Sequence, residues 1–325
     1  MKYNYFPNTG LKVSRISLGT MMFGGQTSEA DSIDIIHCAL DGGINFIDTA
    51  DQYNRGASEI AVGKALAGRR DSVILATKVC NPMSDDMNDQ GLSRRHIISA
   101  CEASLKRLGT DYIDIYYMHK PDYNTPVEES IEAMTQLVRD GKVRYIGISN
   151  YASWQAADIL WTAELKNLIK PVVTQNVYNL LTRGIEEELL PFCREHKIGL
   201  TVYNPIAAGL LAGKHKYGDR PTPETRFALN KTYADRYWNE KNFQALDSFI
   251  KLAEDCGMPI LEFAMKWVDA CPLVTSIISG VSRKEQLVQN MSILESGNGA
   301  IPAEAMTRAA EIYADLTGRR FKYNR

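Results

Sequence analysis

SVILATKV, residues 72–79, is a short run of mostly apolar residues that shows no alternation between apolar and polar positions. Such a run is typical of a strand that is buried on both faces of a parallel sheet. A second apolar run, DIYYMHK, follows at residues 114–120. The segment between them, SRRHIISACEASLKRLG at residues 93–109, opens on a helix-capping serine, ends in glycine and repeats apolar residues at helical spacing. Strand, helix and strand in this order predict one βαβ unit of a parallel sheet.

The same alternation of strands and helices extends over the whole chain. Eight apolar runs are separated by longer amphipathic segments, such as the one that follows Pro126 and stops at Gly141. Eight such units favour a (β/α)8 barrel, an α/β fold, in a single domain that covers residues 1–325. The alternative is a doubly wound open sheet, but no G-x-G-x-x-G turn follows the first run. The runs lie at residues 16–19, 45–49, 72–79, 114–120, 143–150, 171–177, 199–205 and 275–281.

Two segments fall outside this alternation. Residues 1–15 contain the turn Asn8-Thr9-Gly10 and predict a β-hairpin in front of the barrel. Residues 206–241 form a long, aromatic and irregular stretch. A loop of that length in a compact domain is usually functional, and the long βα loops of a barrel surround the C-terminal ends of its strands.

The composition is that of an ordinary globular protein. The chain is 45% hydrophobic and 23% charged, with a formal net charge of −2, whereas a nucleic-acid-binding protein needs a basic face. The N-terminus has no apolar signal core, and no run reaches the roughly 18 to 20 apolar residues of a membrane span. We therefore expect a cytoplasmic protein that binds neither nucleic acid nor membranes. The six cysteines form no C-x-x-C pair and the five histidines show no ligand spacing, so no metal site is expected.

Polar residues end several of the predicted strands. Asp48, Lys78 and His119 lie one residue before the ends of the second, third and fourth runs, and Tyr53 follows Asp48 by five residues. Active-site residues of a barrel gather at the C-terminal ends of the strands, so these side chains are expected around one mouth. Lysine is almost never fully buried without a partner, and Asp48 on the neighbouring strand is the obvious partner for Lys78.

Placed together, these four residues make a proton donor of Tyr53. A phenol with its ordinary pKa of about 10 is a reluctant acid near neutral pH. A lysine ammonium about 4 Å away stabilises the phenolate by roughly 4 kcal/mol, or about three pKa units before desolvation is subtracted. Asp48 would keep Lys78 charged and in place, and His119 would donate a hydrogen bond to the substrate. The arrangement suits protonation of a carbonyl oxygen while hydride arrives at its carbon.

The residues quoted so far resemble the aldo-keto reductase superfamily of NAD(P)H-dependent (β/α)8 reductases. FIDTADQYNRGASE is similar to the family's Asp-to-Tyr signature, ATKV to its lysine strand and YYMHKPD to its histidine strand. The resemblance extends from TGLKVSRISLGT to GVSRKEQLVQN, nearly the whole chain. Within the superfamily, FGGQ, GLSRRHII and NTPVEESIEAM resemble the branch of the voltage-gated potassium-channel β subunits and their bacterial relatives.

The resemblance implies roles for the four polar residues. Tyr53 would be the general acid and Lys78 the group that lowers its pKa. Asp48 would be the partner of the lysine and would also belong to the cofactor site. His119 would orient the carbonyl substrate.

The resemblance also implies NADPH as cofactor, with NADH as the alternative. Residues near the nicotinamide would be Thr20, Met21, Ser149, Asn150, Gln175 and Tyr203, of which Tyr203 would stack on the ring. A loop over the pyrophosphate would contain Asn204, Pro205, Ile206, Ala207, Gly209 and Lys214, with Arg226 toward the adenosine. A helix N-terminus suited to a phosphate, and the helix that follows, would contribute Gly280, Ser282, Arg283, Gln286 and Asn290. Many family members carry arginine where this chain has Ser282, so strict NADP specificity is not implied.

The implied function is reduction of an aldehyde or ketone to an alcohol. An alternative is a cofactor-bound, redox-sensing regulatory or scaffold subunit with weak reductase activity. A third reading, a metal-dependent isomerase or hydrolase, would need more carboxylates or histidines at the strand ends than Asp48 and His119 supply. The sequence leaves open the small-molecule carbonyl substrate, the direction of the reaction and assembly into a homo-oligomer.

Overall fold

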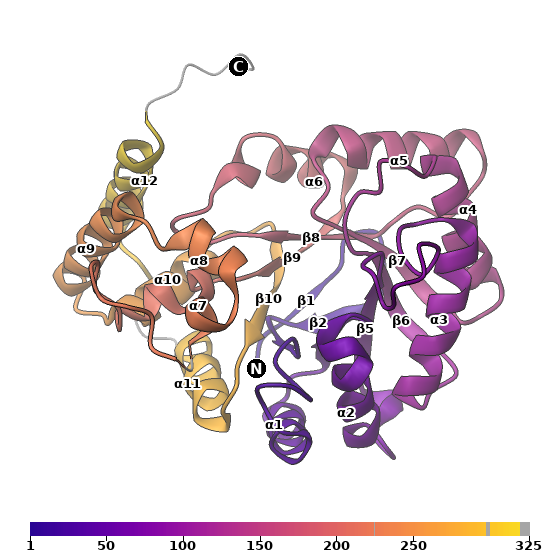
Figure 1. The fold of residues 1–325 in the computed structure, drawn as a ribbon. Helices are drawn as coiled ribbons and strands as arrows, with labels where there is room; N and C mark the ends of the chain where they lie inside the picture. The colour runs from indigo at the N-terminus through magenta and orange to yellow at the C-terminus, as the bar shows by residue number, and fades with distance from the viewer. Residues whose placement is uncertain (224, 297–299, 319–325) are drawn as a thin grey trace. The chain divides into compact units, whose positions relative to one another are not determined.

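Eight parallel strands form a closed barrel in the computed structural model, which describes residues 1–223, 225–296 and 300–318 (Figure 1). Around the barrel the strands follow one another in chain order from β3 to β10, and β10 pairs with β3 to close the ring. The (β/α)8 prediction is therefore confirmed, and each of the eight predicted runs overlaps one strand. The strands are β3 Ile16–Gly19, β4 Phe46–Asp48, β5 Ile74–Val79, β6 Ile113–Met118, β7 Val143–Ser149, β8 Val173–Val177, β9 Gly199–Tyr203 and β10 Val274–Gly280.

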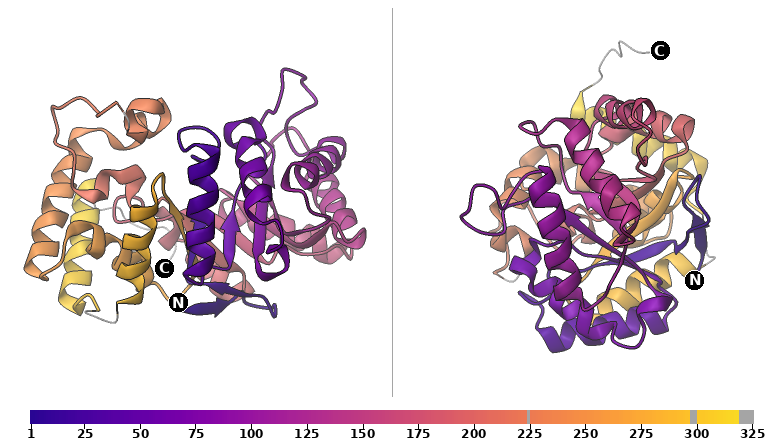
Figure 2. Two further views of the ribbon diagram at one scale, coloured as in Figure 1. Left: turned by 90° about the horizontal axis from the view of Figure 1, so that it is seen from below. Right: turned by 90° about the vertical axis from the view of Figure 1, so that its right-hand side faces the viewer.

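Helices follow the strands, and successive helices pack against one another, as α1 and α2 do side by side in Figure 2. The predicted capping of α3 is confirmed: the Ser93 side chain accepts a hydrogen bond from His96 N, and Gly109 ends the helix with a φ of 62°. These helices are α1 Glu29–Asp41, α2 Ala57–Ala65, α3 Arg94–Leu108, α4 Val127–Arg139, α5 Ser153–Leu165 and α6 Leu189–His196, with the 3-10 helix η1 Tyr53–Gly56 before α2.

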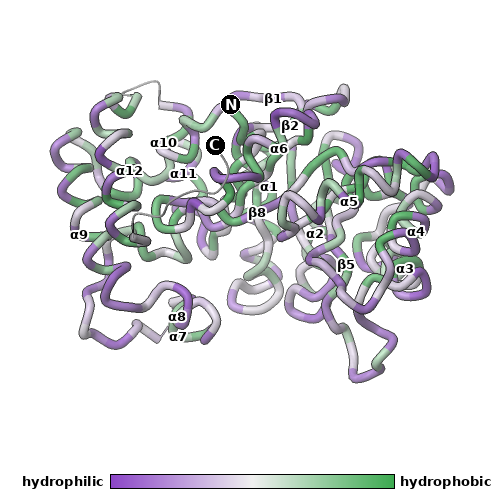
Figure 3. The backbone as a smooth tube through the Cα atoms, turned by 90° about the horizontal axis from the view of Figure 1, so that it is seen from above, coloured by the Kyte–Doolittle hydropathy of each residue, from purple (hydrophilic) through white to green (hydrophobic). Residues whose placement is uncertain are grey.

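The predicted N-terminal hairpin is also confirmed. β1 (Tyr3–Tyr5) pairs antiparallel with β2 (Lys12–Ser14) across a turn in which Asn8 has a φ of 59°. Phe6 is fully buried and meets Phe46 edge to face, with ring centroids 6.1 Å apart. It packs in one core cluster with Ile115, Tyr117 and Val173. The hairpin therefore covers apolar side chains of the strands. In Figure 3, where the backbone is coloured by residue hydropathy, hydrophobic and hydrophilic stretches alternate along the chain.

The chain divides into two compact units. The first contains residues 1–176, 185–203 and 273–292, and with them the barrel strands; the second contains residues 177–184, 204–272 and 293–325. One domain over residues 1–325 stays a prediction. The stretch 206–241 is less irregular than expected, because it contains the 3-10 helix η4 and the helices α7 and α8. The remaining helices are η4 Ala207–Ala212, α7 Arg226–Leu229, α8 Lys231–Tyr237, α9 Glu240–Asp255, α10 Ile260–Asp269, α11 Lys284–Glu295, α12 Ala303–Thr317 and the short η2 Arg70–Ser72 and η3 Gly184–Glu186.

In the three stretches that the structure describes, no helix is both long enough and apolar enough to cross a lipid bilayer.

Candidate active site

The four polar residues singled out in the sequence lie at the C-terminal ends of neighbouring strands. Asp48 is the last residue of β4, and Tyr53 begins η1 five residues later. Lys78 is the penultimate residue of β5, in register with Tyr117 of β6, and His119 directly follows that strand. The C-terminal end of the strands is where barrel enzymes place their active sites.

Lys78 connects Asp48 to Tyr53. Its Nζ atom lies 2.5 Å from Asp48 Oδ1 and 3.4 Å from the Tyr53 hydroxyl. The third acceptor is the carbonyl oxygen of Thr49, 2.7 Å away. An ammonium group has three hydrogens to donate, so all of them are used. Because Nζ donates to the Tyr53 oxygen, the phenolic hydrogen must point away from the lysine.

Both members of this ion pair are buried. Lys78 is 0% exposed and Asp48 is 2% exposed. Burial lowers the pKa of Lys78, and the neighbouring Asp48 carboxylate opposes that effect, followed by Asp51 and Glu59. A buried ammonium is costly unless its charge is matched and its hydrogens are bonded. Asp48 supplies the charge, and the three acceptors supply the bonds.

Gln175 holds the second oxygen of Asp48. Its side-chain Nε2 donates to Asp48 Oδ2 at 2.7 Å, and its backbone carbonyl oxygen accepts a hydrogen bond from the Ser149 hydroxyl at 2.9 Å. Sequence reasoning placed Gln175 near the nicotinamide. Its contact here is with the carboxylate that partners the lysine, so it fixes Asp48 from across the barrel.

His119 is held by its backbone at both ends. Its N–H donates to the Val79 carbonyl at 2.9 Å, and its own carbonyl accepts from Asn150 Nδ2 at 2.9 Å. Its ring meets Tyr53 edge to face, with centroids 6.0 Å apart. Burial, with the charges of Lys78 and Lys120 adding to it, lowers the pKa of His119 well below its usual value. The ring is therefore neutral at pH 7 and has one donor and one acceptor nitrogen.

The residues expected near the nicotinamide fall into two groups. Tyr203 donates from its hydroxyl to Asn150 Oδ1 at 2.8 Å, and Asn150 has a φ of 63°, which places these two side chains together beside Ser149. Thr20 is fully buried, and its hydroxyl is engaged with Ser58 and with the Asp48 carbonyl. Its side chain therefore supports the strand end. Met21 is half-buried, and its carbonyl accepts from the Asn54 side chain.

At the start of α11, Gln286 turns back on its own helix. Its Oε1 accepts hydrogen bonds from the backbone N–H groups of Ser282 (3.0 Å) and Arg283 (3.2 Å). Asn290 Nδ2 donates to the Ser279 hydroxyl at 3.0 Å, beside Gly280 at the end of β10. The N–H groups expected to bind a phosphate are thus capped by Gln286, and both amide side chains are engaged within the protein.

In the second unit, the loop after β9 has unusual backbone geometry. Asn204, Ala207 and Ala208 have φ values of 60°, 49° and 59°, and Gly209 has a φ of 103°. Asn204 Oδ1 accepts from Ala208 N at 3.2 Å and from an Arg226 guanidinium nitrogen at 3.5 Å. Of the other residues that sequence reasoning placed in this loop, Ile206 is half-buried, Pro205 is buried and Lys214 is exposed.

Comparison with known proteins assigns the chain to a family. Residues 15–314 match the sequence model of the aldo/keto reductase family. The chain belongs to the aldo/keto reductases. This family generally uses NAD(P)H. The protein is therefore an oxidoreductase of that family, and it has a barrel fold.

Individual relatives support the same assignment. A "probable voltage-gated potassium channel subunit beta" from Arabidopsis thaliana is 35% identical over 302 residues, which cover 91% of this chain and 92% of the relative. An "uncharacterized oxidoreductase YrpG" from Bacillus subtilis is 41% identical over 306 residues, 91% of each chain. "Aflatoxin B1 aldehyde reductase member 2" from Rattus norvegicus is 35% identical over 297 residues, 86% of this chain and 80% of the relative.

Sequence reasoning missed several groups of this aldo/keto reductase site. Asp51 is fully buried, and burial, followed by the charge of Glu59, raises its pKa to about 8. Glu59 is also fully buried and accepts from Arg107 Nε at 2.6 Å and from the Thr77 hydroxyl at 2.5 Å. Both carboxylates lie within the quoted Asp-to-Tyr signature. Charged residues are usually exposed, so the sequence did not indicate that these two are buried. Asn81 contacts His119, but it lies in a loop whose sequence has no periodic pattern, so the contact was not predicted.

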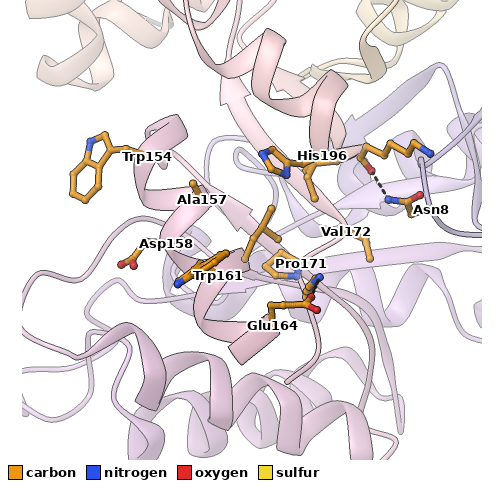
Figure 4. Close-up of a pocket in the computed structure, with 13 residues that line it drawn as sticks. Asn8, Trp154, Ala157, Asp158, Trp161, Glu164, Pro171, Val172 and His196 are labelled. Atoms are coloured by element: carbon orange, nitrogen blue, oxygen red, sulfur yellow. Dashed lines mark hydrogen bonds and ion pairs between the residues drawn. The ribbon is translucent and has the colours of Figure 1, made fainter. Parts of the chain in front are cut away.

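A groove of about 930 Å³ on the aldo/keto reductase barrel lies away from this site (Figure 4). Pro171 and Val172 of its lining precede β8, and Lys197 and Ile198 precede β9. The groove is therefore at the N-terminal ends of the strands, opposite to Asp48, Lys78 and His119. It also includes Trp154 and Trp161 of α5, which are both 66% exposed.

Proposed function

We propose that this aldo/keto reductase reduces an aldehyde or ketone to an alcohol with NADPH, and that Tyr53 is the general acid. The observation that carries the proposal is the position of Lys78 Nζ, which contacts both Asp48 Oδ1 and the Tyr53 hydroxyl. When bound, the nicotinamide cofactor supplies the hydride for the carbonyl carbon. The protein supplies the proton for the carbonyl oxygen.

The proton moves from the Tyr53 oxygen to the carbonyl oxygen. The phenolic hydrogen points away from Lys78, because Nζ occupies a lone pair of the Tyr53 oxygen. When the hydrogen leaves, the phenolate lies 3.4 Å from the ammonium group. At an effective dielectric constant of about 20, that separation corresponds to roughly 5 kcal/mol of attraction before desolvation is subtracted. Lys78 therefore makes Tyr53 a stronger acid than an isolated phenol.

Asp48 and Gln175 keep the lysine ready for this step. Asp48 balances the ammonium charge, and Gln175 holds Asp48 through its second oxygen. His119 is neutral and donates one ring N–H to the carbonyl oxygen beside Tyr53. Two donors aimed at one oxygen stabilise the negative charge that develops on it.

The residues present fit a dinucleotide. Asn204 Nδ2 is buried and has no hydrogen-bond partner among the described residues, so a bound polar group would satisfy it. Positive φ values at Asn204, Ala207 and Ala208 are strained conformations of the kind found at ligand-binding loops. Ser149, Asn150 and Tyr203 would bind the nicotinamide, and the loop with Lys214 and Arg226 would bind the phosphates and adenosine. Ser282, Arg283 and Lys284 would use their side chains to bind the 2′-phosphate that distinguishes NADPH from NADH.

The similarity to potassium channel β subunits favours a second candidate function, a nucleotide-binding regulatory subunit. The two functions differ in turnover. The test is to follow loss of reduced-nicotinamide absorbance with NADPH, and then NADH, over a panel that includes reactive aromatic aldehydes, and to identify the alcohol formed. Alcohol formation with NADPH is the expected result. Nucleotide binding without turnover would favour the regulatory function, and no binding of either nucleotide would contradict both.

A further inference from the structure

Asn81 contacts the imidazole of His119. Its Nδ2 atom lies 3.1 Å from His119 Nδ1. An amide nitrogen carries hydrogens and has no lone pair to offer, so it can only donate. Nδ1 must then be the acceptor nitrogen of the ring, and the single proton of the neutral imidazole must be on Nε2.

We propose that Asn81 is a positioning residue that fixes the tautomer of His119 with the proton on Nε2, so that Nε2–H is the group that donates to the substrate. The catalytic consequence rests on the proposed reductase function. The assignment of the tautomer does not, because it follows from the contact between the two side chains alone.

The backbone on both sides of this contact is restrained. Asn81 precedes Pro82, which confines its backbone to extended conformations. The preceding residue, Cys80, accepts a hydrogen bond at its carbonyl from Gly91 N at 2.8 Å, which ties down the start of the loop. His119 is held by Val79 and Asn150. Because β5 and β6 run in parallel register, with Val79 opposite Met118, the residues that follow these strands are brought side by side.

The groups around the ring also favour a neutral His119. The charges that act on it are the ammonium groups of Lys78, from β5, and Lys120, which follows it in the chain; both oppose a second proton. On η1, the Tyr53 ring lies edge to face against the imidazole. With one proton on the ring, the partner of Nδ1 decides which nitrogen carries it.

The tautomer decides whether His119 helps or hinders a carbonyl substrate. Nε2 is the ring nitrogen farther from the backbone. With hydrogen on Nε2, His119 and Tyr53 can both donate to one carbonyl oxygen. With hydrogen on Nδ1, the Nε2 lone pair would repel the lone pairs of that oxygen. Asn81 therefore selects the form of His119 that can assist reduction.

The test is NMR of the full-length protein labelled with 15N at histidine, recorded without cofactor or substrate. The chain has five histidines, so His119 can be assigned from the spectrum of His119→Gln. The expected result for the wild type is a protonated Nε2 and an unprotonated Nδ1. In Asn81→Asp the carboxylate accepts a hydrogen bond, so Nδ1 is expected to become protonated; in Asn81→Ala the preference for one tautomer should be lost.

The matched control is Asn88→Asp, which makes the same change at an exposed position of the same loop. It should leave the His119 signals unchanged, and thermal unfolding of all variants checks that they fold. In the carbonyl reduction assay, Asn81→Asp should lower kcat/KM about tenfold to a hundredfold. The new carboxyl group should also add an ionisation to the pH profile of kcat/KM. A loss of packing alone would not produce that ionisation.

Two results would overturn the inference: a wild-type His119 that carries its proton on Nδ1, or an unchanged tautomer in both Asn81 variants. Failure of the proposed function looks different. If the spectra show the expected tautomers and no carbonyl compound is reduced, the role of Asn81 in fixing the ring stands and the reductase proposal is wrong.

Discussion

Lys78 Nζ and Asp48 Oδ1 lie 2.5 Å apart at the ends of adjacent strands, and both side chains are buried. Removal of one partner leaves an uncompensated charge in the interior, whereas removal of both leaves none. Comparing the single variants with the double variant therefore separates the effect of the ion pair on stability from its effect on catalysis.

We expect Asp48→Asn to lower the free energy of unfolding by about 3 to 5 kcal/mol, because it leaves Lys78 buried without a counter-charge. The double variant Asp48→Asn, Lys78→Met should regain much of that loss and still be inactive. Urea unfolding and the carbonyl reduction assay on the two single variants and the double variant provide the measurement. Purely additive losses of stability would show that the two charges do not interact in the folded protein.

Much of this arrangement could be predicted from the sequence. Most of the barrel strands are largely apolar runs, and Asp48, Lys78 and His119 lie at or next to the C-terminal ends of three of them. The contact between Gln175 and Asp48 could not be predicted, because it joins residues 127 positions apart across the barrel. Capping by Gln286 depends on a side-chain rotamer in the first turn of α11, and the contact between Asn81 and His119 depends on rotamers in loops; no sequence period specifies either. The short helices between residues 206 and 241 have too few turns to produce one.

Asp51 should make stability depend on pH. Its pKa is raised from 3.8 to about 8, chiefly by burial, so the folded protein retains a proton that the unfolded chain releases. Its contribution to the free energy of unfolding is therefore fully present below pH 4 and is lost as the pH rises to about 8. Between pH 6 and pH 9, unfolding free energy should fall by about 3 kcal/mol more in the wild type than in Asp51→Asn. Urea unfolding at the two pH values measures this difference, and equal pH dependence in both proteins would contradict it.

Arg283 should contribute to the choice between NADPH and NADH. In the proposed site it binds the 2′-phosphate, so Arg283→Ala should weaken NADPH binding by about tenfold, or 1.4 kcal/mol, and leave NADH binding nearly unchanged. Arg95→Ala, at an exposed position on α3, is the matched control. Fluorescence titration with both nucleotides gives the dissociation constants. Equal weakening of the two nucleotides would place Arg283 away from the 2′-phosphate.

The most direct test of the central claim, that Tyr53 gives the proton, is the turnover of Tyr53→Phe with NADPH and a reactive aromatic aldehyde. The variant lacks only the hydroxyl that Lys78 contacts, and Tyr123→Phe, at a residue that is 83% exposed, serves as control. We predict that kcat falls by about 10²- to 10⁴-fold in Tyr53→Phe while NADPH binds with unchanged affinity. A kcat within about tenfold of the wild type, with NADPH binding intact, would contradict the assignment of Tyr53 as general acid.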